Sequence, residues 1–129
     1  MNDIFDKIIA KEISAQFVYE DDVCVVVMDK FPVVTGQVLI IPRQCVDYYF
    51  NLDDETLTHL LAVSKKIAHA LDLTYATLRT CMTVEGFEVP HAHIKLYPRT
   101  VMGHETRGGT EVSDEVLAKE AKKIKMALS

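Results

Sequence analysis

Residues 88–99 have the sequence Glu88-Val89-Pro90-His91-Ala92-His93-Ile94-Lys95-Leu96-Tyr97-Pro98-Arg99. Side chains alternate between the two faces of a β-strand. One face of this strand is apolar and belongs in a core, and its members are Ala92, Ile94 and Leu96. The other face carries two imidazoles and an ammonium, spaced about 7 Å apart, and its members are His91, His93, Lys95 and Tyr97. Three such groups in a row repel one another unless they face water or an anion, and phosphate is the obvious anion.

The composition bounds the class of protein. The chain has 129 residues, of which 49% are hydrophobic, and this is enough apolar material for a single domain with one core. Its 14 basic and 19 acidic side chains give a net charge of −5, divided into −7 over residues 1–55 and +2 over residues 56–129. Because an acidic chain repels phosphate backbones at long range, we expect no binding of nucleic acid.

Two further features bear on the compartment. No apolar run approaches the roughly 20 residues of a membrane-spanning helix, so we expect no membrane association, and the N-terminus lacks the pattern of a secretory signal. The cysteines Cys24, Cys45 and Cys81 are odd in number and widely spaced. This usage is typical of reduced thiols, and we therefore expect a cytoplasmic protein.

Hydrophobic periodicity predicts the elements. Apolar residues recur at helical spacing over residues 3–12, 53–71 and 113–128, with Asp3, Asp53 and Ser113 as N-caps. β-branched or alternating runs predict strands at residues 17–20, 23–28, 38–41, 75–84 and 92–97. The strands cluster instead of alternating strictly with helices, so we expect an α+β domain with a mainly antiparallel sheet.

The two histidines alone leave several interpretations open. An ordinary edge strand with its polar face in solvent would show the same pattern, because a bare His-x-His is a weak motif. Two histidines at this spacing can also ligate zinc, although the sequence shows no third ligand at a suitable spacing.

The wider sequence resembles the histidine triad (HIT) family of nucleotide hydrolases and transferases. The signature of that family is His-φ-His-φ-His-φ-φ, where φ is apolar, and residues 91–97 match it except that Lys95 replaces the third histidine. Residues 4–13, 19–43 and the segment that begins at Asn51 follow the family in order. The resemblance covers roughly residues 4–100 of one domain, 1–129, that ends in a loop and a helix at 101–129. It implies the HIT-like α+β fold and a homodimer in which two sheets join.

The resemblance also implies roles for individual residues. His93 would attack the α-phosphate of a nucleotide and form a nucleotidyl-histidine, with His91 orienting the site and Lys95 stabilising charge. Asp29 would bind the ribose hydroxyls, although a strand-end aspartate is also a common turn residue. Arg99 is a further candidate phosphate contact. An apolar cleft for the base would be formed by residues that could equally be ordinary core, namely Ile4, Phe5, Ile8, Val27 and Met28.

The loop before the histidines departs from the family. Hydrolases of the family usually have Gly-Gln-(Ser/Thr)-Val before the first histidine, with an Asn and a Gly upstream. This chain has Gly86-Phe87-Glu88-Val89, with Thr80 and Met82 near the upstream positions. Phe87 cannot donate a hydrogen bond to phosphate, and a carboxylate at Glu88 would repel one.

The zinc site of some family members is also altered. Their Cys-x-x-Cys aligns with Asp3 and Asp6, and their distal histidine aligns with Cys45, so that only His91 remains of the set. Aspartate is a poorer ligand than thiolate at a structural zinc site, and we therefore expect no structural zinc.

These observations lead to one main hypothesis about function. We expect a HIT-type hydrolase that needs no cofactor and cleaves a nucleotide, with a purine base, at its α-phosphate, the substrate being a nucleoside phosphoramidate or a dinucleoside polyphosphate. The alternative is a nucleotide-binding module with weak or no catalysis, because of the residues that depart from the family, namely Thr80, Phe87, Glu88 and Lys95. A uridylyltransferase-like transfer is disfavoured, because a short chain leaves little room for a second substrate.

Overall fold

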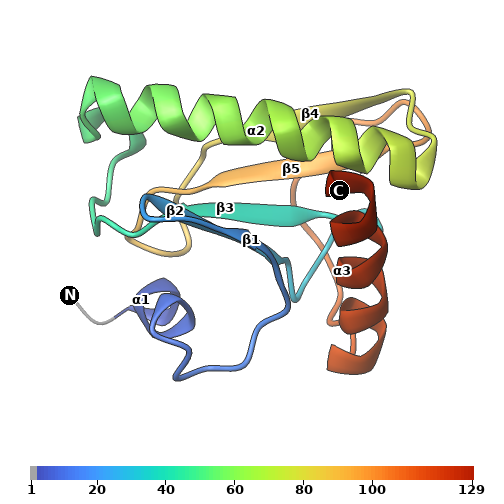
Figure 1. Cartoon of the computed structure of the whole chain (residues 1–129), viewed down its shortest axis with the longest axis horizontal. Helices are drawn as coiled ribbons and strands as arrows, with labels where there is room; N and C mark the ends of the chain where they lie inside the picture. Colours follow the sequence, from blue (N-terminus) through green and yellow to red (C-terminus); the bar gives the residue numbers. More distant parts are fainter. Residues whose placement is uncertain (1–2) are drawn as a thin grey trace.

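Five antiparallel strands form one sheet in the computed structural model, which describes residues 3–129 (Figure 1). The strands are β1 (Phe17–Glu20), β2 (Cys24–Met28), β3 (Val38–Pro42), β4 (Arg79–Thr83) and β5 (Ile94–Arg99). The helices are α1 (Ile4–Ile9), α2 (Asp54–Tyr75) and α3 (Asp114–Leu128), with a single 3-10 turn, η1, at Tyr49–Asn51. The strand order is β1-β2-β3-β5-β4, which confirms the predicted α+β class.

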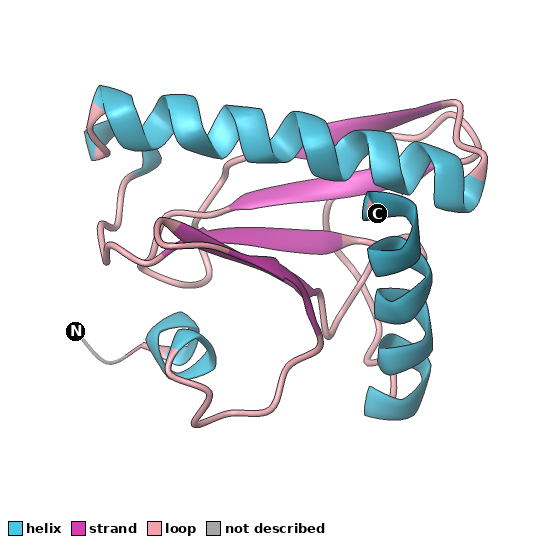
Figure 2. Cartoon of the chain, viewed as in Figure 1, coloured by secondary structure: helices cyan, strands magenta, loops and turns pink. Residues whose placement is uncertain are grey.

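Helices cover the sheet on both faces, and Figure 2 shows α1 on the opposite side from α2. Every residue of β2 and β3 is buried, as the β-branched runs predict. The larger core lies between the sheet and the helices α2 and α3, and includes Val26, Val38, Ile40, Leu60, Ile67 and Ile124. The smaller core lies under α1 and consists of Phe5, Ile8, Val25, Val27, Leu39 and Ile41.

The three predicted N-caps are confirmed. The carboxylate of Asp53 accepts a hydrogen bond from the Thr56 N–H at 2.8 Å, and Ser113 caps α3 in the same way. At α1, Asp3 accepts from the Asp6 N–H at 2.8 Å while the Asp6 carboxylate accepts from the Asp3 N–H at 3.3 Å. This reciprocal capping box stabilises a helix of only six residues, which ends three residues earlier than its periodicity predicts.

The predicted strand at residues 75–84 is wrong at its beginning. Tyr75 is the last residue of α2, and β4 begins at Arg79. The Tyr75 hydroxyl donates to Glu120 of α3 at 2.7 Å. Its ring lies against Gly36, where any Cβ would overlap the ring. These tertiary contacts hold the last turn helical despite the strand propensity of the segment.

The histidine segment is not at the edge of the sheet. β5 pairs with β3 on one side and with β4 on the other, so the solvent-facing edge-strand interpretation is wrong. The strand occupies Ile94–Arg99 instead of residues 92–97, and both histidines precede it. Ala92, Ile94 and Leu96 are buried as predicted.

The C-terminal segment completes the same core. Helix α3 packs against α2 and β1, and its buried residues are Leu117, Ala121 and Ile124. Among residues 3–129, none of the helices has the length and apolar content needed to span a membrane.

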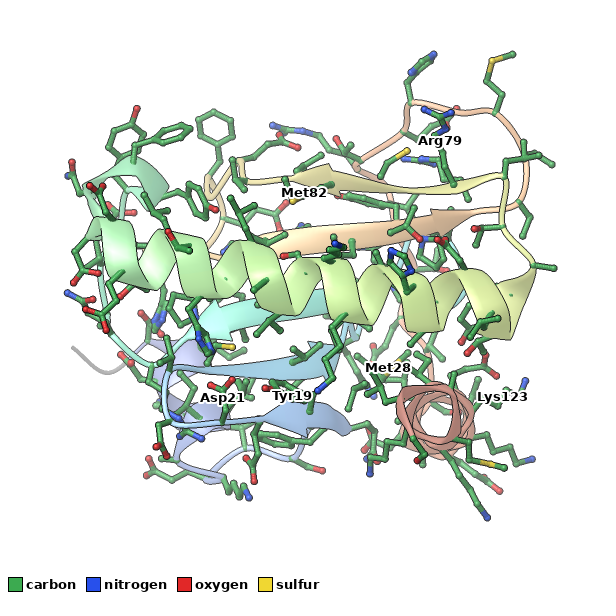
Figure 3. All side chains as sticks on the ribbon, turned by 45° about the horizontal axis from the view of Figure 1, so that its top comes forward. Tyr19, Asp21, Met28, Arg79, Met82 and Lys123 are labelled. Atoms are coloured by element: carbon green, nitrogen blue, oxygen red, sulfur yellow. The ribbon has the colours of Figure 1, made fainter. Side chains whose placement is uncertain are left out.

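A cluster around Asp21 joins the β1–β2 hairpin to α2, and Figure 3 shows Tyr19 and Asp21 together on the hairpin. Asp21 Oδ2 accepts from the Tyr19 hydroxyl and contacts His59 Nε2, both at 2.7 Å. Its Oδ1 accepts from the N–H groups of Val23 and Cys24 at 2.8 and 2.9 Å. Burial by itself raises the pKa of Asp21, but these hydrogen bonds outweigh it and hold that pKa well below its usual range.

Replacing this carboxylate tests whether the cluster stabilises the fold. We expect Asp21→Asn to lower the free energy of unfolding at pH 7 by about 2 kcal/mol, because charged hydrogen bonds are lost. The folded pKa lies below the unfolded one, so the stabilisation is present above the unfolded pKa and disappears as the pH falls through the folded pKa. Urea titrations should therefore show the two proteins converging as the pH falls below about 4. The exposed neighbour Asp22→Asn is the control, and a difference that does not depend on pH would contradict the account.

Candidate active site

A cavity of about 590 Å³ lies between α1, the ends of β2 and β5, and the beginning of α3. Eight of the predicted site residues line it, namely Ile4, Phe5, Ile8, Val27, Met28, Asp29, His93 and Lys95. Residues from both halves of the chain, separated by more than 60 positions, therefore meet at one place.

The geometry of His93 leaves one ring nitrogen free for chemistry. Its side chain is 4% exposed, and Nδ1 donates to the carbonyl oxygen of His91 at 2.8 Å. Since a carbonyl can only accept, the proton of a neutral ring is on Nδ1 and the lone pair is on Nε2. Burial lowers the pKa of His93, and the positive charge of Lys95 lowers it further, so the neutral form is favoured. The Phe5 ring packs edge-on against the imidazole of His93, with 4.8 Å between the ring centroids, and restricts its movement.

His91 does not line the cavity. It is fully buried beneath α1, where Nε2 donates to the carbonyl of Pro42 at 2.7 Å and Nδ1 faces Asp3 Oδ2 at 3.2 Å. Its backbone carbonyl is the group that holds His93. His91 therefore influences the cavity by orienting His93, and its own ring does not line the cavity.

Asp29 is held in place by a residue that the sequence interpretation missed. Asp29 Oδ2 accepts from Gln37 Nε2 at 2.7 Å, and Oδ1 accepts from the Phe31 N–H at 2.9 Å. Gln37 is 1% exposed, and its Oε1 accepts from the Val33 N–H at 2.7 Å. Asp29 is thus both a turn residue and a cavity residue. A glutamine directly before the apolar run 38–41 was the available signal.

The loop between β5 and α3 adds residues that lie outside the family resemblance. Two further hollows, of about 260 and 20 Å³, adjoin Lys95, and both are lined by Thr106 and Arg107. Arg107 Nη2 lies 3.5 Å from Glu85 Oε2, and its guanidinium lies over the Phe87 ring with 5.9 Å to the centroid. Because no periodic pattern marks residues 101–112, sequence alone gave no reason to place this loop at the site.

The predicted phosphate contact Arg99 and the position Thr80, which departs from the family pattern, do not lie at this cavity. Arg99 is at the other end of β5, six residues from His93 and thus about 20 Å away along the strand. It lines a separate hollow of about 400 Å³, where its guanidinium contacts the Glu105 carbonyl. The placement predicted for Arg99 is therefore wrong. Thr80 donates to Asp72 of α2 at 2.8 Å and lines none of the four cavities near these strands.

The residues that align with the family's zinc ligands do come together. One ligand atom each from Asp3, Asp6, Cys45 and His91 lies within 4.8 Å of the others. Two contacts link these atoms, because Cys45 Sγ donates to Asp3 Oδ2 at 3.5 Å and His91 Nδ1 lies 3.2 Å from the same oxygen. Burial and the bond to Asp3 raise the pKa of Cys45 to about 11. Both carboxylates also cap α1. A set with two carboxylates, one thiol and one imidazole does not fit structural zinc, which prefers thiolate and imidazole ligands.

Restoring the thiolates tests this conclusion. We expect the purified protein to retain much less than one zinc per chain after incubation with zinc and dialysis, measured by elemental analysis. The double variant Asp3→Cys/Asp6→Cys should retain about one zinc, because it creates a Cys₃His set at the same place. Stoichiometric zinc in the unaltered protein would contradict the assignment, and an empty double variant would show that the geometry is wrong.

Comparison with known proteins agrees with the fold and gives the family. Residues 10–102 match the family model of the HIT domain. A HIT-like protein of Borreliella burgdorferi is 34% identical over 103 residues, which are 74% of each chain. The adenosine 5′-monophosphoramidase of Saccharomyces cerevisiae is 33% identical over 97 residues, covering 74% of this chain and 61% of the yeast protein.

Solved structures support the same family assignment. A HIT-like protein from Bartonella henselae, described as involved in cell-cycle regulation, superposes with a TM-score of 0.85 at 28% identity, covering 98% of this chain and 96% of that one. The family model spans well over half of the sequence, and the likeness in structure extends through α3. The chain belongs to the HIT family.

Proposed function

We propose that this protein is a hydrolase that cleaves nucleotides at the α-phosphate through a nucleotidyl-His93 intermediate. The single observation that supports this most directly is the fixed ring of His93, whose Nδ1–H is bound to the His91 carbonyl. Neutral imidazole with a free Nε2 is a good nucleophile near neutral pH. The yeast relative named as an adenosine 5′-monophosphoramidase supports a reaction of this class.

The reaction has two displacements. His93 Nε2 forms a bond to the α-phosphorus while the bond from phosphorus to the leaving group breaks, and the leaving group takes a proton from water. A water molecule then attacks the same phosphorus, the P–N bond to His93 breaks, and a nucleoside monophosphate is released. Lys95 lines the cavity beside His93, where its ammonium can stabilise negative charge on the phosphoryl oxygens.

The rest of the cavity supplies binding. The apolar side chains of α1 and β2 form a wall against which a base can stack or pack, and a volume of about 590 Å³ accommodates a purine nucleoside. Asp29 lies at the end of β2, and its carboxylate can accept hydrogen bonds from both ribose hydroxyls. No cofactor or metal is needed for these steps.

We also propose a cytoplasmic homodimer. β4 is a terminal strand of the sheet, so its outer backbone groups are available for pairing. It carries the exposed residues Arg79 and Met82, and Figure 3 shows both at that edge. Leu78, directly before the strand, is also exposed. A second copy joined along β4 would cover these side chains. The cytoplasmic location rests on the three free cysteines.

Replacing His93 tests the reaction. We expect the protein to release AMP from adenosine 5′-phosphoramidate or diadenosine tetraphosphate, and mass spectrometry under non-acidic conditions to find a nucleotidyl adduct on His93. His93→Ala should lower AMP release at least a thousandfold, roughly the effect of removing a nucleophile. His69→Ala, on the exposed face of α2, is the matched control.

The same experiment separates the alternative function. A nucleotide-binding module with little or no catalysis would bind AMP but release none above the level of His93→Ala. The carboxylate of Glu88 beside Lys95 is the observation that favours this alternative, because it repels phosphate. Absence of both binding and turnover would contradict both functions.

Replacing Asp29 tests ribose recognition. We expect Asp29→Asn to raise KM about tenfold for ribonucleotides, since charge-assisted hydrogen bonds to the hydroxyls weaken. A 2′,3′-dideoxy substrate has no such hydroxyls, so its KM should be nearly the same in both proteins. An equal rise for both substrates would assign Asp29 a purely structural role in the turn it forms with Gln37.

A further inference from the structure

The three hollows around the proposed nucleophile share two charged residues. Glu88 and Lys95 are the only residues that line all three of them, within the described part of the chain. The two smaller hollows contain none of the apolar residues from α1 that form the base wall. The hollow of about 20 Å³ also contains His93 but not Asp29, so it lies on the side of His93 away from the nucleoside, where a leaving group would be, whereas the hollow of about 260 Å³ extends to Asp29.

A polyphosphate leaving group would need free positive charges on that side, and the side chains there do not supply them. Arg107, the cation contributed by the loop before α3, is already paired with Glu85 at 3.5 Å. Within residues 3–129, neither Glu88 nor Lys95 has a partner within ion-pair distance. In the smallest hollow, where Glu85 and Arg107 are paired with each other, Lys95 is thus the free ammonium and Glu88 the free carboxylate.

The two free charges have different neighbours. Lys95 acts on His93, whose pKa its positive charge lowers, and so lies where the α-phosphate must be bound. Glu88 follows Phe87 in the loop, and Phe87 has no polar group to offer a leaving group. A leaving group that extends past Lys95 therefore meets a carboxylate. A polyphosphate is repelled there, and an ammonium group is attracted.

We propose that Glu88 is a specificity-determining residue that selects nucleoside phosphoramidates whose amine leaving group carries a second, positively charged amine. This proposal rests on the proposed function. The P–N bond of the substrate breaks as the bond from His93 to phosphorus forms, the departing nitrogen takes a proton from water, and hydrolysis of the intermediate returns that proton. Glu88 takes no part in these transfers and acts by attracting the distal ammonium group.

Three substrates with one nucleoside test the proposal. The first is the adenosine 5′-phosphoramidate of ethylenediamine, whose distal group is an ammonium. The second is that of ethanolamine, whose distal group is a neutral hydroxyl of similar size, and the third is the anionic diadenosine tetraphosphate. We expect kcat/KM to fall in that order. Glu88→Gln should lower the cationic-to-neutral ratio about fivefold, the size expected for a partly solvated charge pair. Glu12→Gln, an exposed carboxylate on none of the cavities, should leave the ratio unchanged.

Salt gives a readout that a merely structural role would not move. Raising the ionic strength should lower the cationic-to-neutral ratio of the unaltered protein but should not lower that of Glu88→Gln, because the variant lacks the charge that attracts the ammonium group. If Glu88→Gln is active and has the same cationic-to-neutral ratio as the unaltered protein, the proposal is overturned while the proposed function stands.

Failure of the proposed function is recognised separately. If the unaltered protein releases no more AMP than His93→Ala, turnover cannot report on Glu88, and the same three compounds are measured as ligands by calorimetry. A preference for the cationic compound that disappears in Glu88→Gln would support the assignment of charge selection to Glu88. Equal affinities in the two proteins would overturn it.

Discussion

The burial of β2 and β3 on both faces is the constraint on which the rest of the molecule depends. Every residue of both strands is buried, so each face needs a cover of apolar side chains. The helices α2 and α3 pack on one face, whereas α1, which packs on the other, has only six residues and buries only Phe5 and Ile8. On that other face, side chains of α1 together with Val27 and Leu39 of the buried strands form the apolar wall of the cavity. The cleft therefore lies where the shortest helix meets the two buried strands.

One carboxylate links this short helix to the proposed nucleophile. Asp3 caps α1 and also faces the ring of His91, and the His91 carbonyl fixes the ring of His93. The wall of the cleft and the orientation of the nucleophile therefore share an anchor. At the place where some family members bind zinc, this chain has a helix cap and a buried histidine beside the capping carboxylate, and these contacts link the same segments.

The sequence predicts well those features that depend on local chemistry. The caps Asp3, Asp53 and Ser113 were found because side-chain capping leaves a local signature, and β2 and β3 because runs of β-branched residues have few alternatives. The end of α2 was missed because Tyr75 is held helical by Glu120, 45 positions away. No window of sequence contains both residues.

The site residues likewise divide into those that a sequence pattern predicts and those that only the tertiary structure places. Phe5, on α1, and His93, directly before β5, both line the cavity that the family pattern predicts, because that pattern fixes their positions relative to the strands. Gln37 was missed because its partner, Asp29, lies across a turn that gives no periodic signal. Arg99 was misplaced because a cation after the motif is near in sequence yet at the far end of the strand.

The nucleoside side and the leaving-group side of the cavity differ in how well they tolerate amino-acid substitution. The base wall is made of α1 and β2 side chains that are also core, so any substitution there alters packing as well as binding. The leaving-group side is made by residues 85–88 and by Thr106 and Arg107, which lie in loops and carry no core. Such loops can exchange charge at little cost in stability. Glu88 stands in one of them, so a change of leaving group requires only a change of charge on an exposed loop, while recognition of the nucleoside stays tied to the fold.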